Sequence, residues 1–413
     1  MGFNQLDLAS SWQFFRDEIN FADAVCFQNY LCDRHLAPKQ LATPEYAAVA
    51  NYAYHFSADK LGRFLHDHCV NKLGVKYVCA NFQGVKSGED GGISALYLDS
   101  GEELDGDLFI DCSGSRALLM GKHFNVPLNS QKHILFNDTA LAVQAPYPEP
   151  NAPIASVTNA TAQSNGWIWD IGLPNRKGIG HVYSSEFISE ERAVDELHRY
   201  LELSLPTEIV KTLSIRKIQY EPGFRQTFWH KNCLAIGMSA GFVEPLEATA
   251  LVMIEAAATL VSADLPVSRD VMPIAAARFN RRFEYYWKTT IDFLKLQYHL
   301  TQRKDTHYWV ENARIETLTS SLSELLSLWR RQSPNRLDFP LAEEMLPAAS
   351  WQYILYGMKF KTHLRKTSHR KIDKELFSKI VAEVRQKSIY TAQRLPDHRQ
   401  LISDIVELGF QRG

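Results

Sequence analysis

The segment from Asn232 to Leu251 constrains the fold more than any other part of the chain. It reads NCLAIGMSAGFVEPLEATAL, and its apolar run 233–236 ends at Gly237. Such a run predicts a short, buried parallel strand, and the glycines that follow let the backbone approach a ligand closely. An Ala-rich, helix-favouring stretch over 248–260 comes next. A strand, a glycine turn and a helix N-terminus in this order present free amides to an anion or a phosphate.

Two carboxylates, Glu244 and Glu247, precede the predicted helix. In one interpretation they only complement the positive end of the helix dipole. In the other, at least one of them serves chemistry at the turn. The helix itself, 248–260, is almost entirely apolar, so we expect it to be buried, and at this length it is too short to span a bilayer.

A second segment, residues 107–116, reads DLFIDCSGSR and predicts a buried strand that ends in small residues. Ser113 and Gly114 at such a strand end can lie against a dinucleotide. Any buried strand before a turn gives the same pattern, so the segment is ambiguous when taken alone.

A third segment, GWIWDIG over 166–172, alternates large apolar residues. In a strand, Trp167, Trp169 and Ile171 share one face. These three side chains build either an aromatic wall or a part of an ordinary core.

Composition bears on which partners, metals and cellular location we expect for the protein. The 413 residues carry 45 Lys+Arg against 47 Asp+Glu, which gives no electrostatic reason to expect nucleic acid or a membrane surface as partner. The six cysteines form no CxxC and no zinc-type spacing, and the histidines do not cluster with carboxylates, so we expect reduced thiols and no metal. The first 19 residues include Arg16, Asp17 and Glu18 and are not a signal peptide. We therefore expect a cytoplasmic protein.

Strand signals are frequent before residue 220, and the chain looks helical almost throughout after 270. The predicted fold class is α/β with a mixed sheet. The predicted regions are a core over 1–270 and a mainly helical substrate region over 271–413.

Taken together, these segments resemble the flavin-dependent halogenases of the tryptophan halogenase family. The family's Trp-x-Trp-x-Ile-Pro motif is matched by Trp167, Trp169 and Ile171. Its Gly-Phe-Val-Glu-Pro-Leu-Glu-Ser-Thr-Gly segment is matched by 241–249, and its strand ending Phe-Ile-Asp-Cys-Ser-Gly by 109–114. The run Tyr-Ala-Tyr-His-Phe at 52–56 is another match.

The resemblance implies an enzyme with an FAD-binding, flavin-monooxygenase-like fold. It implies that reduced FAD from a separate flavin reductase, oxygen, and chloride or bromide together halogenate an electron-rich aromatic ring such as tryptophan or another indole. Glu247 matches the catalytic glutamate, and Thr249 with Ala250 matches the halide site. The wall of a tunnel would be Trp167, Trp169 and Ile171. The residues expected to contact FAD are Ser113, Gly114, Gly237, Gly241, Phe242, Pro245 and Leu246.

The sequence departs from the family most strongly at its start. None of the 21 glycines forms a Gly-x-Gly-x-x-Gly motif. The nearest match begins at Gly178 and Gly180, but Tyr183 stands where the third glycine would be. Lys39 is the only lysine before Tyr52, and its context does not match that of the family's catalytic lysine. We therefore expect that the first βαβ unit is missing, that the chain is truncated at its N-terminus, and that it binds FAD poorly and turns over little.

Three smaller departures concern the site. Gly172 replaces the proline of the Trp-x-Trp motif, and Ala248 and Ala250 replace Ser and Gly. Because an L-residue at 250 cannot take a positive φ cheaply, we expect the halide loop to differ from that of the family. The aromatic box of tryptophan-specific members is absent from 342–350, which weakens the expectation of free tryptophan as substrate.

Two alternatives stay open. One is a hydroxylating flavin monooxygenase, and the other is a degenerate scaffold without activity. The small-molecule substrate and the reductase are the expected partners, and a homodimer is compatible with the sequence.

Overall fold

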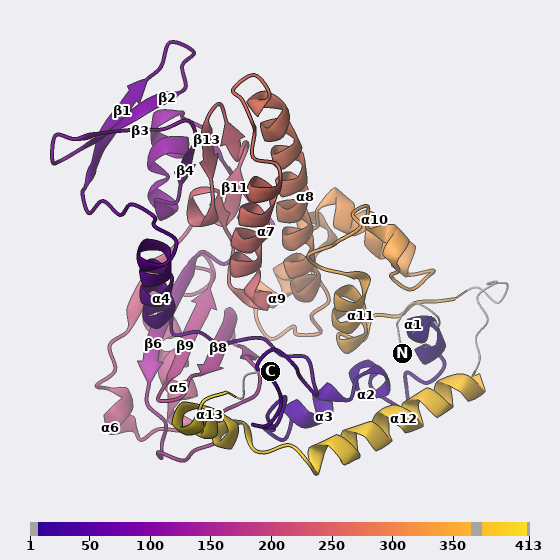
Figure 1. Ribbon diagram of the computed structural model, residues 1–413. Helices are drawn as coiled ribbons and strands as arrows, with labels where there is room; N and C mark the ends of the chain where they lie inside the picture. The colour runs from indigo at the N-terminus through magenta and orange to yellow at the C-terminus, as the bar shows by residue number, and fades with distance from the viewer. Residues whose placement is uncertain (1–6, 365–373, 411–413) are drawn as a thin grey trace. The chain divides into compact units, whose positions relative to one another are not determined.

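The computed structural model describes residues 7–364 and 374–410 (Figure 1). They pack as two compact units whose segments alternate along the chain. The first unit is made of Met1–Ser57, Thr139–Ile218 and Leu296–Gly413, and the second of Ala58–Asp138 and Gln219–Lys295. Neither unit coincides with the predicted regions 1–270 and 271–413, because each draws segments from both sides of residue 270.

The first unit is built on a five-stranded sheet with the strand order β10-β6-β9-β8-β7. The strands are β6 (Thr139–Ala145), β7 (Asn159–Ala162), β8 (Gly166–Gly172), β9 (Lys177–Tyr183) and β10 (Arg216–Gln219). The pairs β6–β9, β9–β8 and β8–β7 are antiparallel. This register places Trp169 opposite Gly180.

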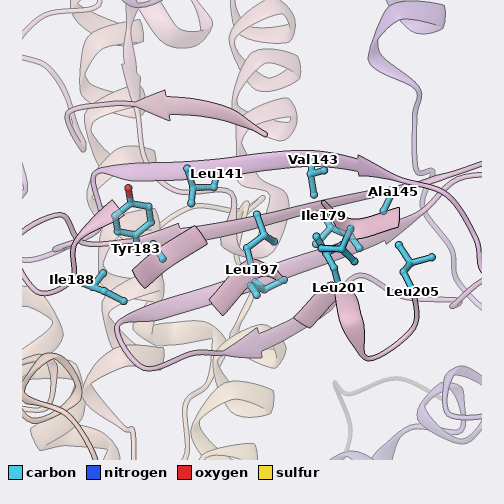
Figure 2. Close-up of a cluster of buried hydrophobic side chains, with 12 residues drawn as sticks. Leu141, Val143, Ala145, Ile179, Tyr183, Ile188, Leu197, Leu201 and Leu205 are labelled. Carbon is cyan, nitrogen blue, oxygen red and sulfur yellow. The ribbon is translucent and has the colours of Figure 1, made fainter. Parts of the chain in front are cut away.

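One face of this sheet is covered by α5 (Glu190–Glu202). Ser189 caps the helix by accepting from the Arg192 N–H, and apolar residues recur at helical spacing on its inner face. Leu197 and Leu201 of α5 pack with Leu141 and Ile179 of the sheet in a buried cluster (Figure 2). The hydrophobic core of the first unit's sheet therefore lies between β6, β9 and α5.

The remaining helices of the first unit include several after residue 300, and these confirm the expectation of a helical C-terminal region. They are α1 (Leu8–Trp12), α2 (Phe21–Val25), α3 (Gln28–Cys32), α6 (Thr207–Val210), α9 (His307–Asn312), α10 (Ser320–Trp329), α11 (Ala348–Gly357), α12 (Lys374–Ala392) and α13 (His398–Leu408). The long helix α12 packs along α1, α2 and α3 (Figure 1). Aromatic rings fill this part of the unit, among them Trp12 and Phe21 against Tyr356.

The second unit holds three small sheets. An antiparallel meander joins β1 (Phe82–Ser87), β2 (Ile93–Leu98) and β3 (Glu103–Asp105). The second sheet has the order β12-β13-β4, with β4 (Phe109–Asp111), β12 (Trp229–His230) and β13 (Cys233–Ala235). The third has the order β14-β11-β5, with β5 (Leu128–Ser130), β11 (Gly223–Arg225) and β14 (Gly241–Phe242). Because β13 pairs with β4 in parallel and with β12 antiparallel, the predicted mixed pairing is confirmed.

The helices of the second unit are α4 (Ala58–Asn71), α7 (Thr249–Ala263) and most of α8 (Met272–His299). Between strands and helices lie short helical turns: η1 (Gly114–Arg116), η2 (Leu118–His123), η3 (Gly237–Ser239) and η4 (Leu246–Ala248).

The prediction that the apolar helix after Glu247 is buried was wrong. Only a narrow stripe of α7 is buried, and it includes Met253 and Ala257, whereas Leu251, Val252 and Ile254 are exposed. Apolar composition indicates that a helix can be buried, but burial also needs neighbouring elements. The elements that contact α7 most are two short turns, η3 and η4. The prediction that this helix is too short to span a bilayer was also wrong, because the apolar segment extends over residues 246–263. This segment has a mean hydropathy of 1.5, is only 22% buried, and has the length and composition of a membrane span, as some core helices of soluble proteins also do.

Candidate functional site

The carboxyl ends of β4 and β13 bring two of the predicted cofactor-binding turns together. The strands run parallel, with Phe109 opposite Cys233 and Asp111 opposite Ala235. The turn η1 that follows β4 therefore contacts η3, which follows β13. Ligands of open α/β sheets bind at this edge, outside the carboxyl ends of the strands.

Asp111 organises these turns from inside. Its carboxylate is buried and accepts hydrogen bonds from the backbone N–H groups of Ser113 at 3.0 Å, Leu119 at 3.0 Å and Met120 at 2.9 Å. The Ser113 hydroxyl also donates to this carboxylate, and the Ser239 hydroxyl donates to the Asp111 carbonyl. Asp111 thus ties the end of β4 to both turns. This role of Asp111 was not predicted, although an aspartate that directly follows the apolar residues 108–110 is a sequence signal for it.

The thiols beside Asp111 are not reactive nucleophiles. Burial, together with the charge of Asp111, raises the pKa of Cys233 to about 12. The same two causes raise the pKa of Cys112. Both sulfurs therefore stay protonated at neutral pH.

Glycines at the two turns leave space for a ligand. Gly114 has φ +70° and Gly237 has φ +68°, a backbone region that L-residues rarely adopt. A Cβ atom at Gly114 would meet no atom within 4 Å, so the backbone there can be approached closely. A dinucleotide such as FAD can therefore lie against the backbone at Gly114. The chain has no glycine-rich loop of the Gly-x-Gly-x-x-Gly type for the diphosphate, so the residues present fit only a part of the cofactor.

The loop from Glu244 to Thr249 has an unusual backbone. Glu247 and Ala248 both adopt left-handed conformations, with φ of 67° and 52°. Non-glycine residues in this region cost on the order of 1–3 kcal/mol each and persist where the surroundings hold them. A strained backbone was predicted at position 250, but Ala250 lies within α7, and the positive φ angles fall on Glu247 and Ala248.

This loop places Glu247 directly before the start of α7. Ala248 occupies the N-cap position and offers no side-chain hydrogen bond, so no cap side chain competes for the first amides of the helix. Thr249 is buried, while Glu247 and Ala250 are exposed. An exposed carboxylate beside uncapped amides provides a proton acceptor next to an anion-binding position.

Behind the loop, two opposite charges are buried. Glu244 is 2% exposed and accepts from the Asn137 side-chain amide at 2.8 Å. Lys295 of α8 is 0% exposed, and its ammonium lies 4.8 Å from the centre of the Phe136 ring. Burial lowers the pKa of Lys295 to about 7, although the charge of Glu244 acts in the opposite direction. Lys295 was not predicted as a site residue, although it is a lone lysine among Phe293, Leu294 and Leu296.

The predicted aromatic wall belongs to the first unit. Trp167 is buried and Trp169 is half-buried, with their ring centres 6.2 Å apart. Ile168 packs into the cluster under α5, so the two tryptophans and Ile171 lie on the opposite face of the sheet. Since Glu247 lies in the other unit, the function of this face as a tunnel wall stays a prediction.

Comparison with known proteins identifies the family. A family model described as tryptophan halogenase matches residues 3–374. The chain belongs to the tryptophan halogenase family. The resemblance inferred from the three sequence segments is thereby confirmed.

Two curated members of the tryptophan halogenase family show which share of a relative's length the chain covers. Tryptophan 7-halogenase KtzQ of Kutzneria sp. (strain 744) is 38% identical over 289 residues, which is 70% of this chain and 52% of that protein. Tryptophan 7-halogenase RebH of Lentzea aerocolonigenes is 32% identical over 309 residues, which is 75% of this chain and 56% of that protein. The chain spans about half the length of these curated relatives.

Solved structures confirm the fold class. A tryptophan halogenase from Shewanella frigidimarina NCIMB 400 superposes with a TM-score of 0.96 at 41% identity, over 100% of this chain and 78% of that one. Tar14, a tryptophan C-6 flavin-dependent halogenase from taromycin biosynthesis, superposes with a TM-score of 0.88 at 27% identity, over 98% of this chain and 80% of that one. The chain has the α/β fold of flavin-dependent halogenases.

Proposed function

We propose that this chain serves flavin-dependent halogenation of an electron-rich aromatic ring. The observation that carries the proposal is the strained loop that places Glu247 beside the uncapped start of α7, in a chain of the tryptophan halogenase family. The cosubstrates are chloride or bromide, oxygen, and reduced FAD from a separate flavin reductase.

When bound, the flavin supplies the oxidising equivalent that turns halide into an electrophile. The residues that would hold it are Ser113 and Gly114 after β4, Gly237 after β13, and Gly241, Phe242, Pro245 and Leu246 before α7. The diphosphate finds no glycine-rich cradle in this sequence, so we expect weak binding of FAD by these 413 residues.

The chain's own residues act on the halide and on the ring proton. Thr249 and Ala250 bind the halide through the amides at the start of α7. When a carbon–halogen bond forms on the aromatic ring, the same carbon must lose its proton, and the Glu247 carboxylate takes it. Trp167, Trp169 and Ile171 are proposed as the wall of a tunnel, on the face of the first unit's sheet that faces away from α5.

The substrate we propose is an electron-rich aromatic ring of the tryptophan or indole type. The absence of the aromatic box from 342–350 favours an indole other than free tryptophan. The partners are the small aromatic substrate and the reductase, and we propose a cytoplasmic location. A homodimer is a further proposal, tested by the mass of the chain in solution.

A product assay tests the proposed function. The chain is incubated with a flavin reductase, NADH, excess FAD, bromide or chloride, and a panel of indoles, and the products are identified by mass spectrometry. Halogenated indole supports the proposal. Hydroxylated indole favours a flavin monooxygenase, and the absence of any flavin affinity in gel filtration favours a scaffold without activity.

A further inference from the structure

Lys295 and Glu244 are linked by two consecutive residues. The Lys295 ammonium lies over the Phe136 ring, and the next residue, Asn137, donates its side-chain amide to Glu244. All the polar groups in this set are buried: Lys295 is 0% exposed, Asn137 1% and Glu244 2%. The positive charge of Lys295 and the negative charge of Glu244 therefore act on each other through protein rather than through water.

Stability alone does not account for this arrangement. Removing a lysine and a glutamate from water costs several kcal/mol each, and apolar residues of similar volume are often as stable or more stable in their place. The depressed pKa of Lys295 shows that burial outweighs the favourable effect of Glu244. The burial of this amine and this carboxylate, linked through Phe136 and Asn137, points to a task in orienting the chain around them.

The segment that these buried residues can hold in place is the loop from Glu244 to Thr249. Glu247 and Ala248 hold left-handed conformations without the help of glycine. Such strain persists only where the surroundings fix the chain on both sides. On the far side, α7 fixes Thr249, and on the near side Glu244 is the buried anchor.

We propose that Lys295 is a positioning residue that, with Phe136 and Asn137, fixes Glu244 and so holds the loop that presents Glu247 and Thr249. The side chain of Lys295 is fully buried, so it acts through Glu244 and not on the substrate. The expected effect of Lys295 on turnover rests on the proposed function, whereas its role in fixing the loop does not depend on that function.

Hydrogen exchange tests the positioning without flavin or substrate. Lys295→Met and the double variant Lys295→Met/Glu244→Gln are compared with the wild type by mass spectrometry of peptides that cover residues 246–256. Their hydrogen-bonded amides include that of Ala248, which donates to the Pro245 carbonyl at 3.0 Å, and those of the first bonded turn of α7. Both variants should exchange these amides about tenfold faster or more, because the anchor is lost. Lys288→Met is the matched control, since Lys288 lies on the same helix with an exposed side chain, and it should leave the loop unchanged.

The double variant separates positioning from simple charge balance, and it guards against a single variant that does not fold. If Lys295 only neutralises Glu244, removing both charges restores wild-type exchange in the loop, and that result overturns the proposal. Unchanged exchange in both variants overturns it as well.

The effect on turnover is measured separately. In the double variant, kcat for halogenation should fall on the order of 10²-fold with KM for the indole unchanged, because the carboxylate of Glu247 is misplaced by small distances. If the wild type itself gives no halogenated product, the proposed function fails, while the exchange experiment still decides the positioning.

Discussion

At the scale of single residues, Lys295 makes stability depend on pH. The ordinary pKa of 10.5 applies to the unfolded chain, whereas burial lowers the folded value to about 7 against the opposing charge of Glu244. Between these values the unfolded chain binds a proton that the folded chain does not. The free energy of unfolding should therefore rise with pH, by at most about 1.4 kcal/mol per pH unit.

Urea denaturation at pH 7, 8 and 9 measures this slope. Lys295→Met should lose the rise, whereas Lys288→Met, with its exposed side chain, should keep it. Equal slopes in the wild type and in Lys295→Met would show that Lys295 does not titrate in this range.

Gly180 makes room for Trp169. A Cβ atom on Gly180 would lie 2.1 Å from the Trp169 ring, whereas one on Gly178, in the same strand, would meet nothing within 4 Å. We expect Gly180→Ala to lower the free energy of unfolding by about 1–3 kcal/mol and to change the tryptophan fluorescence. Gly178→Ala should do neither, and a similar effect of both substitutions would contradict the observed packing.

The roles of single residues were only partly predictable. The shared face of Trp167, Trp169 and Ile171 follows from the two-residue period of a strand, because that period does not depend on distant contacts. The neighbours of Lys295 could not be predicted, because Phe136 and Glu244 are distant in the sequence and are brought near Lys295 by the tertiary fold.

At the scale of elements, α7 has two very different sides. Met253 is 5% exposed and Leu251 is 58% exposed, although both are large apolar residues of the same helix. Met253→Ala should cost about 2–5 kcal/mol of stability, and Leu251→Ala should change it by less than about 0.5 kcal/mol. Thermal unfolding of both variants checks this. A loss at Leu251 as large as that at Met253 would mean that another surface covers the outer side of α7 in solution.

The same helix shows where pattern-based prediction of elements stops. The predicted parallel strand at 233–236 and the helix at 248–260 were found as Cys233–Ala235 and Thr249–Ala263, because apolar runs, glycines and alanines act locally. The burial of the helix was predicted wrongly, because the sequence of an element does not contain its neighbours.

At the scale of the whole molecule, the order of segments in space could not be read from composition. The chain passes between the two units at Ser57, Asp138 and Ile218, and again within α8. No shift in composition marks these points. The α/β class, in contrast, was predictable and is confirmed, because alternating strand and helix patterns restrict the layers that a chain of this length can form.

The site was predictable as a set of motifs rather than as an assembled geometry. The segments after β4 and β13 were predicted separately as cofactor-binding turns, and the structure brings them together because the two strands are parallel. Asp111, which ties these turns together, and the buried charges behind Glu247 emerged only from the structure.

The central claim is that Glu247 removes the ring proton in halogenation, and substitution of this carboxylate tests it most directly. Halogenated indole is quantified for the wild type, Glu247→Gln and Glu255→Gln with the same reductase and saturating FAD and bromide. Glu255 is the matched control, an exposed glutamate on α7 outside the loop. We expect product formation to fall at least about 10²-fold in Glu247→Gln and to stay at the wild-type rate in Glu255→Gln. Equal rates in Glu247→Gln and the wild type would contradict the account.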